Sequence, residues 1–494
     1  MKIEFQHSQW DQTECDVLVL PIFEDDDYQS GLLSQIDDKL DGLLREVREN
    51  EEWKGKMGDC AVLYRPPGLP LRRIVLVGAG QREHYDLGTI REVAVAAVNR
   101  VKSYHLKRVA FCRRSRVDAA LAAQAAVEGV LLATYSGDDF KTEDRAKNFI
   151  EEIIFVSPEA HDRQAVEEAL HRGSILAEAT NYARYLVNQP GNCVNPSKLA
   201  EEARTTAEKY GLSLEVMGEP EMEEEGMLAA LAVARGSDEP ARFIILRHQG
   251  GGDEEAPLVL VGKGVTFDSG GYSLKPPAAM EDMKVDKSGA CAVLAAMQAV
   301  ARLGLKKNVI GLIPTVENMV SGRAQRPGDI VRSLSGKTIE VLNTDAEGRL
   351  ILADALAYAQ RYKPAAVVDI ATLTGACVVA LAHVRAGVFA NDESIFAGLE
   401  EASRRSGERL WRLPLDRQYR KLLDSDIADI KNVGGRWGGA VTAAKFLEEF
   451  VGEMPWAHID MAGVDSFHES APLKGATGFG TRILVEFVSH FQAG

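Results

Sequence analysis

Short apolar runs alternate with amphipathic stretches over the first 160 residues. Runs rich in Val, Ile and Phe predict strands, and stretches whose apolar residues recur every three or four positions predict helices. The predicted strands are 16–23, 72–80, 108–112 and 150–158, and the predicted helices are 30–48, 88–103 and 117–134. This alternation is typical of a largely parallel sheet with helices on its faces.

A long amphipathic stretch, 162–187, comes next, with charged residues on one face and Ala and Leu on the other. It ends at Asn188-Gln189-Pro190-Gly191, where proline and glycine together are a strong helix stop. Two domains are what a chain of 494 residues normally forms. We therefore predict an N-terminal domain over 1–160, a helical linker over 161–190 and a larger C-terminal domain over 191–494.

The C-terminal part repeats the alternation. Strands are predicted at 243–249, 257–267, 308–318 and 365–373, each followed by helix-like sequence. The acidic segment 219–225 is predicted to be a surface loop. The fold class predicted for the chain is α/β, with two domains that each contain a mainly parallel or mixed sheet flanked by helices.

One apolar window, 365–384, is about as long as a membrane span. It contains Asp369, Thr372 and His383, so we interpret it as a buried strand, a loop and the start of another element, and we predict no membrane span. The N-terminus has no apolar signal segment, and six scattered cysteines without a C-x-x-C pair fit the cytoplasm, where we expect the protein. A net charge of −16 argues against nucleic-acid binding.

Acidic and basic side chains beside glycines mark three C-terminal segments as candidate functional sites. The segments are 261–271, with Lys263 and Asp268; 283–290, with Asp286; and 341–350, with Asp345 and Glu347. Open α/β sheets bind ligands at the carboxyl ends of their strands. Oxygen donors with almost no histidine suit Mn²⁺, Mg²⁺ and, where a nitrogen donor is present, Zn²⁺.

Asp345 and Glu347 lie two residues apart, which puts both carboxylates on one side of an extended segment but not of a helix. We therefore predict an extended segment here, with Arg349 on the same side and a helix just beyond. Ordinary interpretations also exist. Asp345 and Glu347 could lie in a solvated loop, and Lys263 could be a surface lysine or pair with Asp268. Asp286 could form a simple ion-pair cluster with Lys284 and Lys287. Acids and lysines at three strand ends of one domain, each beside glycine, favour a metal site.

The octapeptide NTDAEGRL at 343–350 resembles the signature of the leucyl aminopeptidase family, peptidase family M17. Other blocks resemble family blocks in the same order: 261–276, 283–290, 317–330, 369–377, 432–447 and 456–463. The resemblance covers roughly residues 170–490. The first 160 residues resemble the family only in length and α/β character.

The resemblance implies two divalent metal ions per chain, Mn²⁺ or Zn²⁺. The implied metal ligands are Asp268 and Glu347 as bridges, Asp345 for the first ion, and Lys263 and Asp286 for the second. Lys275 would stabilise the developing alkoxide, and Arg349 would hold a bicarbonate ion that serves as general base. The implied substrate-binding residues are Met283, in the pocket for the first side chain, Asn343, Thr372, Leu373 and Gly375.

The implied activity of the C-terminal domain is metal-dependent release of N-terminal amino acids, leucine-like ones preferred, from peptides with a free N-terminus. Two cations can share and activate one water. The resemblance also implies a homohexamer. Three alternatives stay open: a non-catalytic DNA-binding protein, which the acidic charge does not favour; a scaffold, which would be expected to lose ligands; and a metal-dependent phosphatase, which would normally show histidines and an anion-binding helix start.

Overall fold

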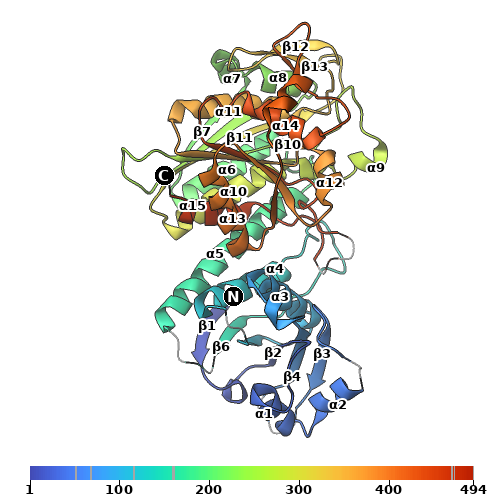
Figure 1. Cartoon of the computed structure of the whole chain (residues 1–494), viewed down its shortest axis with the longest axis vertical. Coiled ribbons are helices and arrows are strands. Elements are labelled where there is room, and N and C mark those ends of the chain that lie inside the picture. Colours follow the sequence, from blue (N-terminus) through green and yellow to red (C-terminus); the bar gives the residue numbers. More distant parts are fainter. Residues whose placement is uncertain are drawn as a thin grey trace. The chain divides into compact units, whose positions relative to one another are not determined.

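The structure is a computed structural model that describes residues 1–492 except 51, 52, 67, 68, 70, 115, 116, 158, 160, 161, 469, 470 and 472. The chain forms two compact units, Met1–Glu178 and Ala179–Gly494, and each combines helices with sheet (Figure 1). The division between the units falls inside one continuous helix, α5 (Arg163–Asn188), where the sequence predicts a helix over 162–187.

The first unit contains a six-stranded sheet in the order β1-β6-β5-β2-β4-β3, parallel except for the β3–β4 pair. Its strands are β1 (Lys2–His7), β2 (Val17–Ile22), β3 (Cys60–Tyr64), β4 (Arg73–Gly78), β5 (Arg108–Cys112) and β6 (Glu152–Ser157). Its helices are α1 (Gly31–Lys39), α2 (Leu43–Glu49), α3 (Leu87–Val101) and α4 (Ala119–Thr134). All four strands predicted here form, and β1 and β3 were not predicted.

Helix α1 packs on one face of this sheet, the face to which alternate residues of β2 point. Leu18 and Leu20 of β2 share a buried apolar cluster with Leu33 and Ile36 of α1. The helix predicted over 30–48 is in fact two helices. Gly42 separates them with φ at 81°, a left-handed conformation that glycine adopts at little cost.

The second unit contains a nine-stranded mixed sheet in the order β16-β15-β18-β14-β9-β11-β8-β7, with β10 paired to β11 off this path. Its strands are β7 (Ser213–Met217), β8 (Arg242–Gln249), β9 (Leu258–Gly262), β10 (Gly264–Asp268), β11 (Asn308–Asn318), β14 (Ala366–Ala371), β15 (Ala386–Ala390), β16 (Leu410–Arg412) and β18 (Trp456–Asp460). A small sheet contains β12 (Asp329–Arg332), β13 (Thr338–Val341) and β17 (Ile430–Lys431). The predicted α/β class is confirmed.

Helices cover both faces of the large sheet. Figure 1 shows α11 and α14 on one side of it and α10, α13 and α15 on the other. The helices of this unit are α6 (Pro196–Tyr210), α7 (Glu219–Glu225), α8 (Leu228–Ala234), α9 (Pro277–Met280), α10 (Ser288–Leu303), α11 (Gly348–Ala359), α12 (Gly375–Leu381), α13 (Glu393–Ser406), α14 (Gly439–Glu448) and α15 (Thr481–His490). Apolar side chains of α8, α11 and α14 form one buried cluster with β9, β11 and β14.

The prediction of a surface loop over 219–225 is wrong, since this segment is helix α7. The Glu221 side chain accepts a hydrogen bond of 2.9 Å from the backbone N–H of Gly218, and Gly226 ends the helix in a left-handed conformation. Both are standard helix-end signals. The run of glutamates obscured them.

The apolar window 365–384 contains β14, a loop and α12, as predicted. No helix within the described residues is long and apolar enough to cross a membrane. The strand predicted over 257–267 divides into β9 and β10, which leaves Lys263 between two strands. This interruption places a charged side chain at the edge of the sheet.

Candidate active site

Five strands of the large sheet end at the same edge. Strands β9, β11, β14 and β18 are mutually parallel neighbours, and β10 runs parallel to β11. Polar residues follow or end these strands, as ligand sites of α/β sheets require. They are Lys263 after β9, Asp268 at the end of β10, Asn318 at the end of β11, residues 372–375 after β14, and Asp460 at the end of β18.

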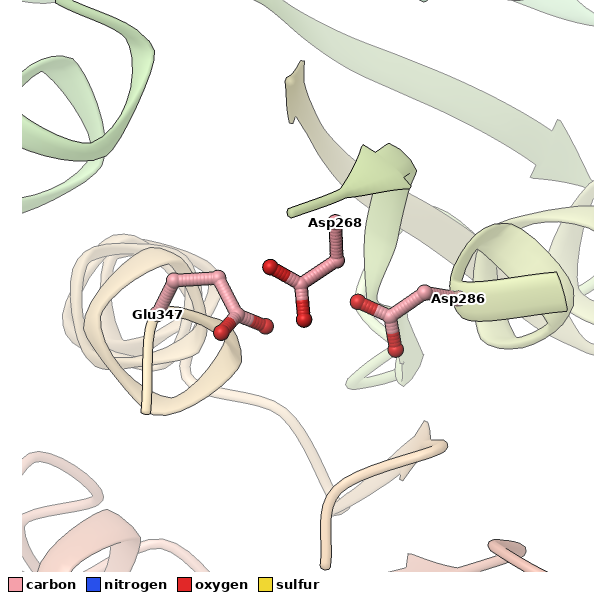
Figure 2. A group of neighbouring side chains, drawn as sticks. All are labelled: Asp268, Asp286 and Glu347. Atoms are coloured by element: carbon pink, nitrogen blue, oxygen red, sulfur yellow. The ribbon is translucent and has the colours of Figure 1, made fainter. Parts of the chain in front are cut away.

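Three carboxylates meet at this edge. Asp268, Asp286 and Glu347 each offer one oxygen within 4.8 Å of the others, and Figure 2 shows the three groups pointing toward one another. None is more than 4% exposed. Burial, with the charges of Glu347 and Asp286, raises the pKa of Asp268 to about 8, and burial raises the pKa of Asp286 to about 6. Such a cluster favours bound cations.

Lys263 is already one such cation. Its Nζ lies 2.7 Å from Asp286 Oδ1 and 2.8 Å from Glu347 Oε1, and it donates to the Thr372 carbonyl at 3.0 Å. Burial acts to lower the pKa of Lys263, but the charges of Asp286 and Glu347 outweigh it and raise the pKa above its usual value. Metal ligation by this amine requires its pKa to be lowered instead, because only a neutral amine has a lone pair to offer.

Lys275 joins the cluster to Asp345. Its Nζ lies 2.8 Å from Asp268 Oδ2 and 2.5 Å from Asp345 Oδ1. Burial acts to lower the pKa of Lys275, but Asp268 outweighs burial, so the pKa is raised and the group remains an ammonium. Asp345 is more open than the three clustered carboxylates, with 33% of its side chain exposed.

The extended segment predicted at 345–347 is not observed. Asp345 lies in a turn, and Glu347 has helical dihedral angles of −72° and −38° as the residue that precedes α11. Arg349 therefore lies in the first turn of α11, where its Nη1 donates to the Asn432 carbonyl at 2.5 Å. Burial lowers the pKa of Arg349 to about 10. Its buried Nε has no hydrogen-bond partner among the described residues.

The donor set fits hard divalent cations. Asp286 Oδ2 and Glu347 Oε2 are buried without a hydrogen-bond partner in the described part of the chain, although each carboxylate's other oxygen contacts Lys263. A buried carboxylate oxygen without a donor is costly unless a cation neutralises it. Carboxylates with one amine are ligands that Mn²⁺ and Zn²⁺ accept.

Of the five residues predicted to bind substrate, Thr372 and Asn343 contact residues of the site directly, and the other three lie near Asp286 or Thr372 along the chain. Met283 belongs to a short 3-10 helix, Met283–Lys287, that also carries Asp286, and Thr372 donates to Asp286 Oδ1 at 2.8 Å. Asn343 accepts from the Asp345 backbone N–H at 2.8 Å. Leu373 is partly buried against the large apolar cluster, whereas Gly375 is exposed at the start of α12.

Three buried polar residues that sequence analysis did not single out hold the loops of the site. Asn318 Nδ2 donates to Asp268 Oδ1 at 2.7 Å and to the Thr344 carbonyl at 3.0 Å. Asp460 accepts from the Leu373 backbone N–H at 3.1 Å and from Thr374 Oγ1 at 2.7 Å. The third residue, Asn432, forms side-chain hydrogen bonds with the backbone of 342–343. A polar residue at the end of an apolar strand is a signal that could have identified Asn318 and Asp460. Asn432 follows the two-residue strand Ile430–Lys431, which gives no such signal.

Gly348 allows Lys263 to reach the cluster. A Cβ on Gly348 would lie 2.5 Å from Lys263 Cε and 2.6 Å from its Nζ. We predict that Gly348→Ala lowers both thermal stability and activity, the latter by about 10²-fold, because the new Cβ would displace Lys263 from its buried ion pairs with Asp286 and Glu347. Breaking such buried pairs outweighs the better helix propensity of alanine, which is worth about 0.5–1 kcal/mol. The control is Gly322→Ala, whose Cβ would meet nothing within 4 Å. Full activity in Gly348→Ala would contradict this role.

Comparison with known proteins identifies the family of this chain. The family profile described as "Cytosol aminopeptidase family, catalytic domain" matches residues 181–485, and that of the family's N-terminal domain matches 19–144. A probable cytosol aminopeptidase of Geotalea uraniireducens is 46% identical over 478 residues, 96% of each chain. One of Geobacter sulfurreducens is 43% identical over 492 residues, 99% of each chain.

Solved structures give the same result. A mutant of tomato leucine aminopeptidase is 35% identical with a TM-score of 0.90, covering 99% of this chain and 96% of its own. The bottromycin maturation enzyme BotP in complex with Mn is 34% identical with a TM-score of 0.83, covering 96% of this chain and 99% of its own.

These matches define the chain as a metallo-aminopeptidase, a hydrolase that acts on peptides. Within that class, it belongs to the cytosol aminopeptidase family. The match at 19–144 corrects the expectation that the first 160 residues share only length and α/β character with the family.

Proposed function

We propose that this aminopeptidase works with two divalent cations held by Lys263, Asp268, Asp286, Asp345 and Glu347. Asp268 and Glu347 would bridge the ions, Asp345 would bind the first, and Lys263 and Asp286 the second. The observation that supports this best is the buried group of three carboxylates, two of which have an oxygen without a hydrogen-bond partner within the described structure. Bound cations would supply an activated water and polarise the scissile carbonyl.

Mn²⁺ and Zn²⁺ are the ions we propose. BotP was solved with Mn, and the oxygen-rich donor set of this chain suits the same ion. Lys263 would have to lose its proton when cations arrive, since its amine would then face two positive charges and not carboxylates alone. Nearby cations lower the pKa of a lysine, so metal binding would shift the pKa of Lys263 down instead of up.

Lys275 and Arg349 would act on the substrate side of the cluster. Asp268 and Asp345 hold the Lys275 ammonium in place, and from there it would donate to the substrate carbonyl oxygen as negative charge develops. Arg349 would hold a bicarbonate ion that provides the general base. Its buried Nε is without a hydrogen-bond partner among the described residues, and a guanidinium edge suits a planar bidentate anion.

The substrate would be a peptide with a free N-terminus and a leucine-like first residue. Met283 would line the pocket for the first side chain, and Asn343, Thr372, Leu373 and Gly375 would line the groove. Thr372 connects this groove to the metal site, because its hydroxyl donates to Asp286 and its carbonyl accepts from Lys263.

A free N-terminal amine should be required for activity. We predict that N-acetyl-Leu-p-nitroanilide is hydrolysed at least ~10²-fold more slowly than Leu-p-nitroanilide, because a group that orients the substrate at the site is blocked. Within a panel of amino-acid p-nitroanilides, the leucine and methionine derivatives should give the highest kcat/KM. Equal rates on blocked and free substrates would show a general amidase instead, and a flat panel would contradict the leucine preference.

Three properties of the whole protein complete the proposal: a homohexamer, a cytoplasmic location and no binding of nucleic acid. The charge of −16 supports the last of these, since a nucleic-acid site needs a concentrated basic face. The names of the bacterial relatives support the cytoplasmic location. Light scattering on the purified protein would test the hexamer, and a salt-dependent gel shift would test nucleic-acid binding.

A further inference from the structure

Asn432 is a fully buried residue that connects two separate parts of the proposed active site. It follows strand β17, and its backbone N–H donates to the Glu340 carbonyl at 2.9 Å. Its Oδ1 accepts from the backbone N–H groups of Leu342 at 2.9 Å and Asn343 at 3.3 Å. Its Nδ2 donates to the Asn343 carbonyl at 2.7 Å.

The segment that Asn432 binds leads directly to a proposed metal ligand. The Asn343 side chain accepts from the Asp345 backbone N–H at 2.8 Å, so Asn432 fixes the start of the turn that carries Asp345. The Asn432 carbonyl also accepts from Arg349 Nη1 at 2.5 Å. One residue thereby sets the position of the Asp345 turn relative to the Arg349 guanidinium.

We infer that Asn432 is a positioning residue that holds Arg349 and the Asp345 turn in register for the reaction. The inference rests on the proposed function, in which Arg349 holds bicarbonate and Asp345 binds a metal ion. An amide suits this position because it provides both an acceptor for two N–H groups and a donor for a carbonyl. Alanine would leave all three backbone groups without this partner. Its backbone carbonyl could still accept from Arg349, but the segment that carries this carbonyl would no longer be tied through the side chain to the Asp345 turn.

Asn308 offers a matched control at the opposite end of strand β11 from the site. It is also buried, and its side chain also makes three bonds to backbone groups: it accepts from Gly251 at 3.0 Å and donates to the carbonyls of Gly252 at 2.7 Å and Glu255 at 3.0 Å. Asn308→Ala therefore removes the same kind of support from a loop outside the proposed active site.

The test measures kcat and KM for Leu-p-nitroanilide, the bicarbonate concentration at half-maximal rate, and the melting temperature of the full-length holoenzyme. Asn432→Ala should lower kcat by about 10- to 100-fold, the usual effect of removing a residue that supports a metal site, and should raise the half-maximal bicarbonate concentration. Asn308→Ala should lower the melting temperature to a similar extent, yet keep the wild-type kcat and bicarbonate response.

Asn432→Asp is the second variant, because it keeps the acceptor for Leu342 and Asn343 but loses the donor to the Asn343 carbonyl. It should also lower kcat and weaken the bicarbonate response. Wild-type values of both quantities in folded Asn432→Ala or Asn432→Asp would overturn the inference, as would failure of both variants to fold. If the rate of the wild-type enzyme does not depend on bicarbonate, this result counts only against the proposed role of Arg349. The comparison of kcat between Asn432→Ala and Asn308→Ala would still decide the role of Asn432.

Discussion

Replacing Lys275 by alanine should lower kcat by about 10²–10³ while both metal ions remain bound. In the structure its ammonium group contacts Asp268 and Asp345, and in the proposed mechanism Lys275 is not a metal ligand. The variant would lose one hydrogen-bond donor to the developing alkoxide, and this donor acts in the transition state. The measurement is kcat for Leu-p-nitroanilide together with metal content, and added metal should give no rescue.

Lys263→Ala is the matched comparison, because both lysines form ion pairs with carboxylates of the same site. If Lys263 is a metal ligand, its removal should weaken one metal site, and excess Mn²⁺ should partly restore the activity. The two variants should therefore differ in metal content and in rescue. Loss of metal from Lys275→Ala, with both ions retained in Lys263→Ala, would show that the two roles are reversed.

Many of the strands and helices could be predicted because periodicity is a local property of the sequence, but β1, β3, β7, β15, β16 and β18 could not. Strand β11 was predicted over 308–318 and is observed with the same bounds. Local charge can obscure the same signal. In 219–225 the glutamates favoured a loop, yet the capping bond of Glu221 and the glycine at 226 make this segment helical.

The contents of the site could be predicted better than its geometry. Strand-end acids and lysines, with the resemblance, identified a set of residues of which the structure brings Asp268, Asp286 and Glu347 together. The contacts that organise them are long-range and leave no periodic pattern. Asn432 and Asn343 are separated by 89 positions, and nothing in the spacing of either residue indicates their hydrogen bond. The helical conformation of Glu347 likewise follows from α11 and not from the two-residue spacing to Asp345.

Removal of metal should abolish the aminopeptidase activity, the largest effect that we expect. Without cations the buried carboxylates repel one another, and the amine of Lys263 stays protonated in ion pairs with Asp286 and Glu347. A chelator should therefore leave a folded but inactive protein, and Mn²⁺, Co²⁺ or Zn²⁺ should restore it. Because the cations would bind only the folded state, restoring them should also raise the melting temperature.

The most direct test of the proposed metal site is a titration of chelator-stripped protein with Mn²⁺. Metal bound per chain would be measured by elemental analysis, and hydrolysis of Leu-p-nitroanilide would be measured at each point. We predict saturation at two ions per chain, as the two-cation proposal requires, with no activity at the start and full activity when both sites are filled. Full activity in protein shown to be free of metal would contradict the proposed mechanism.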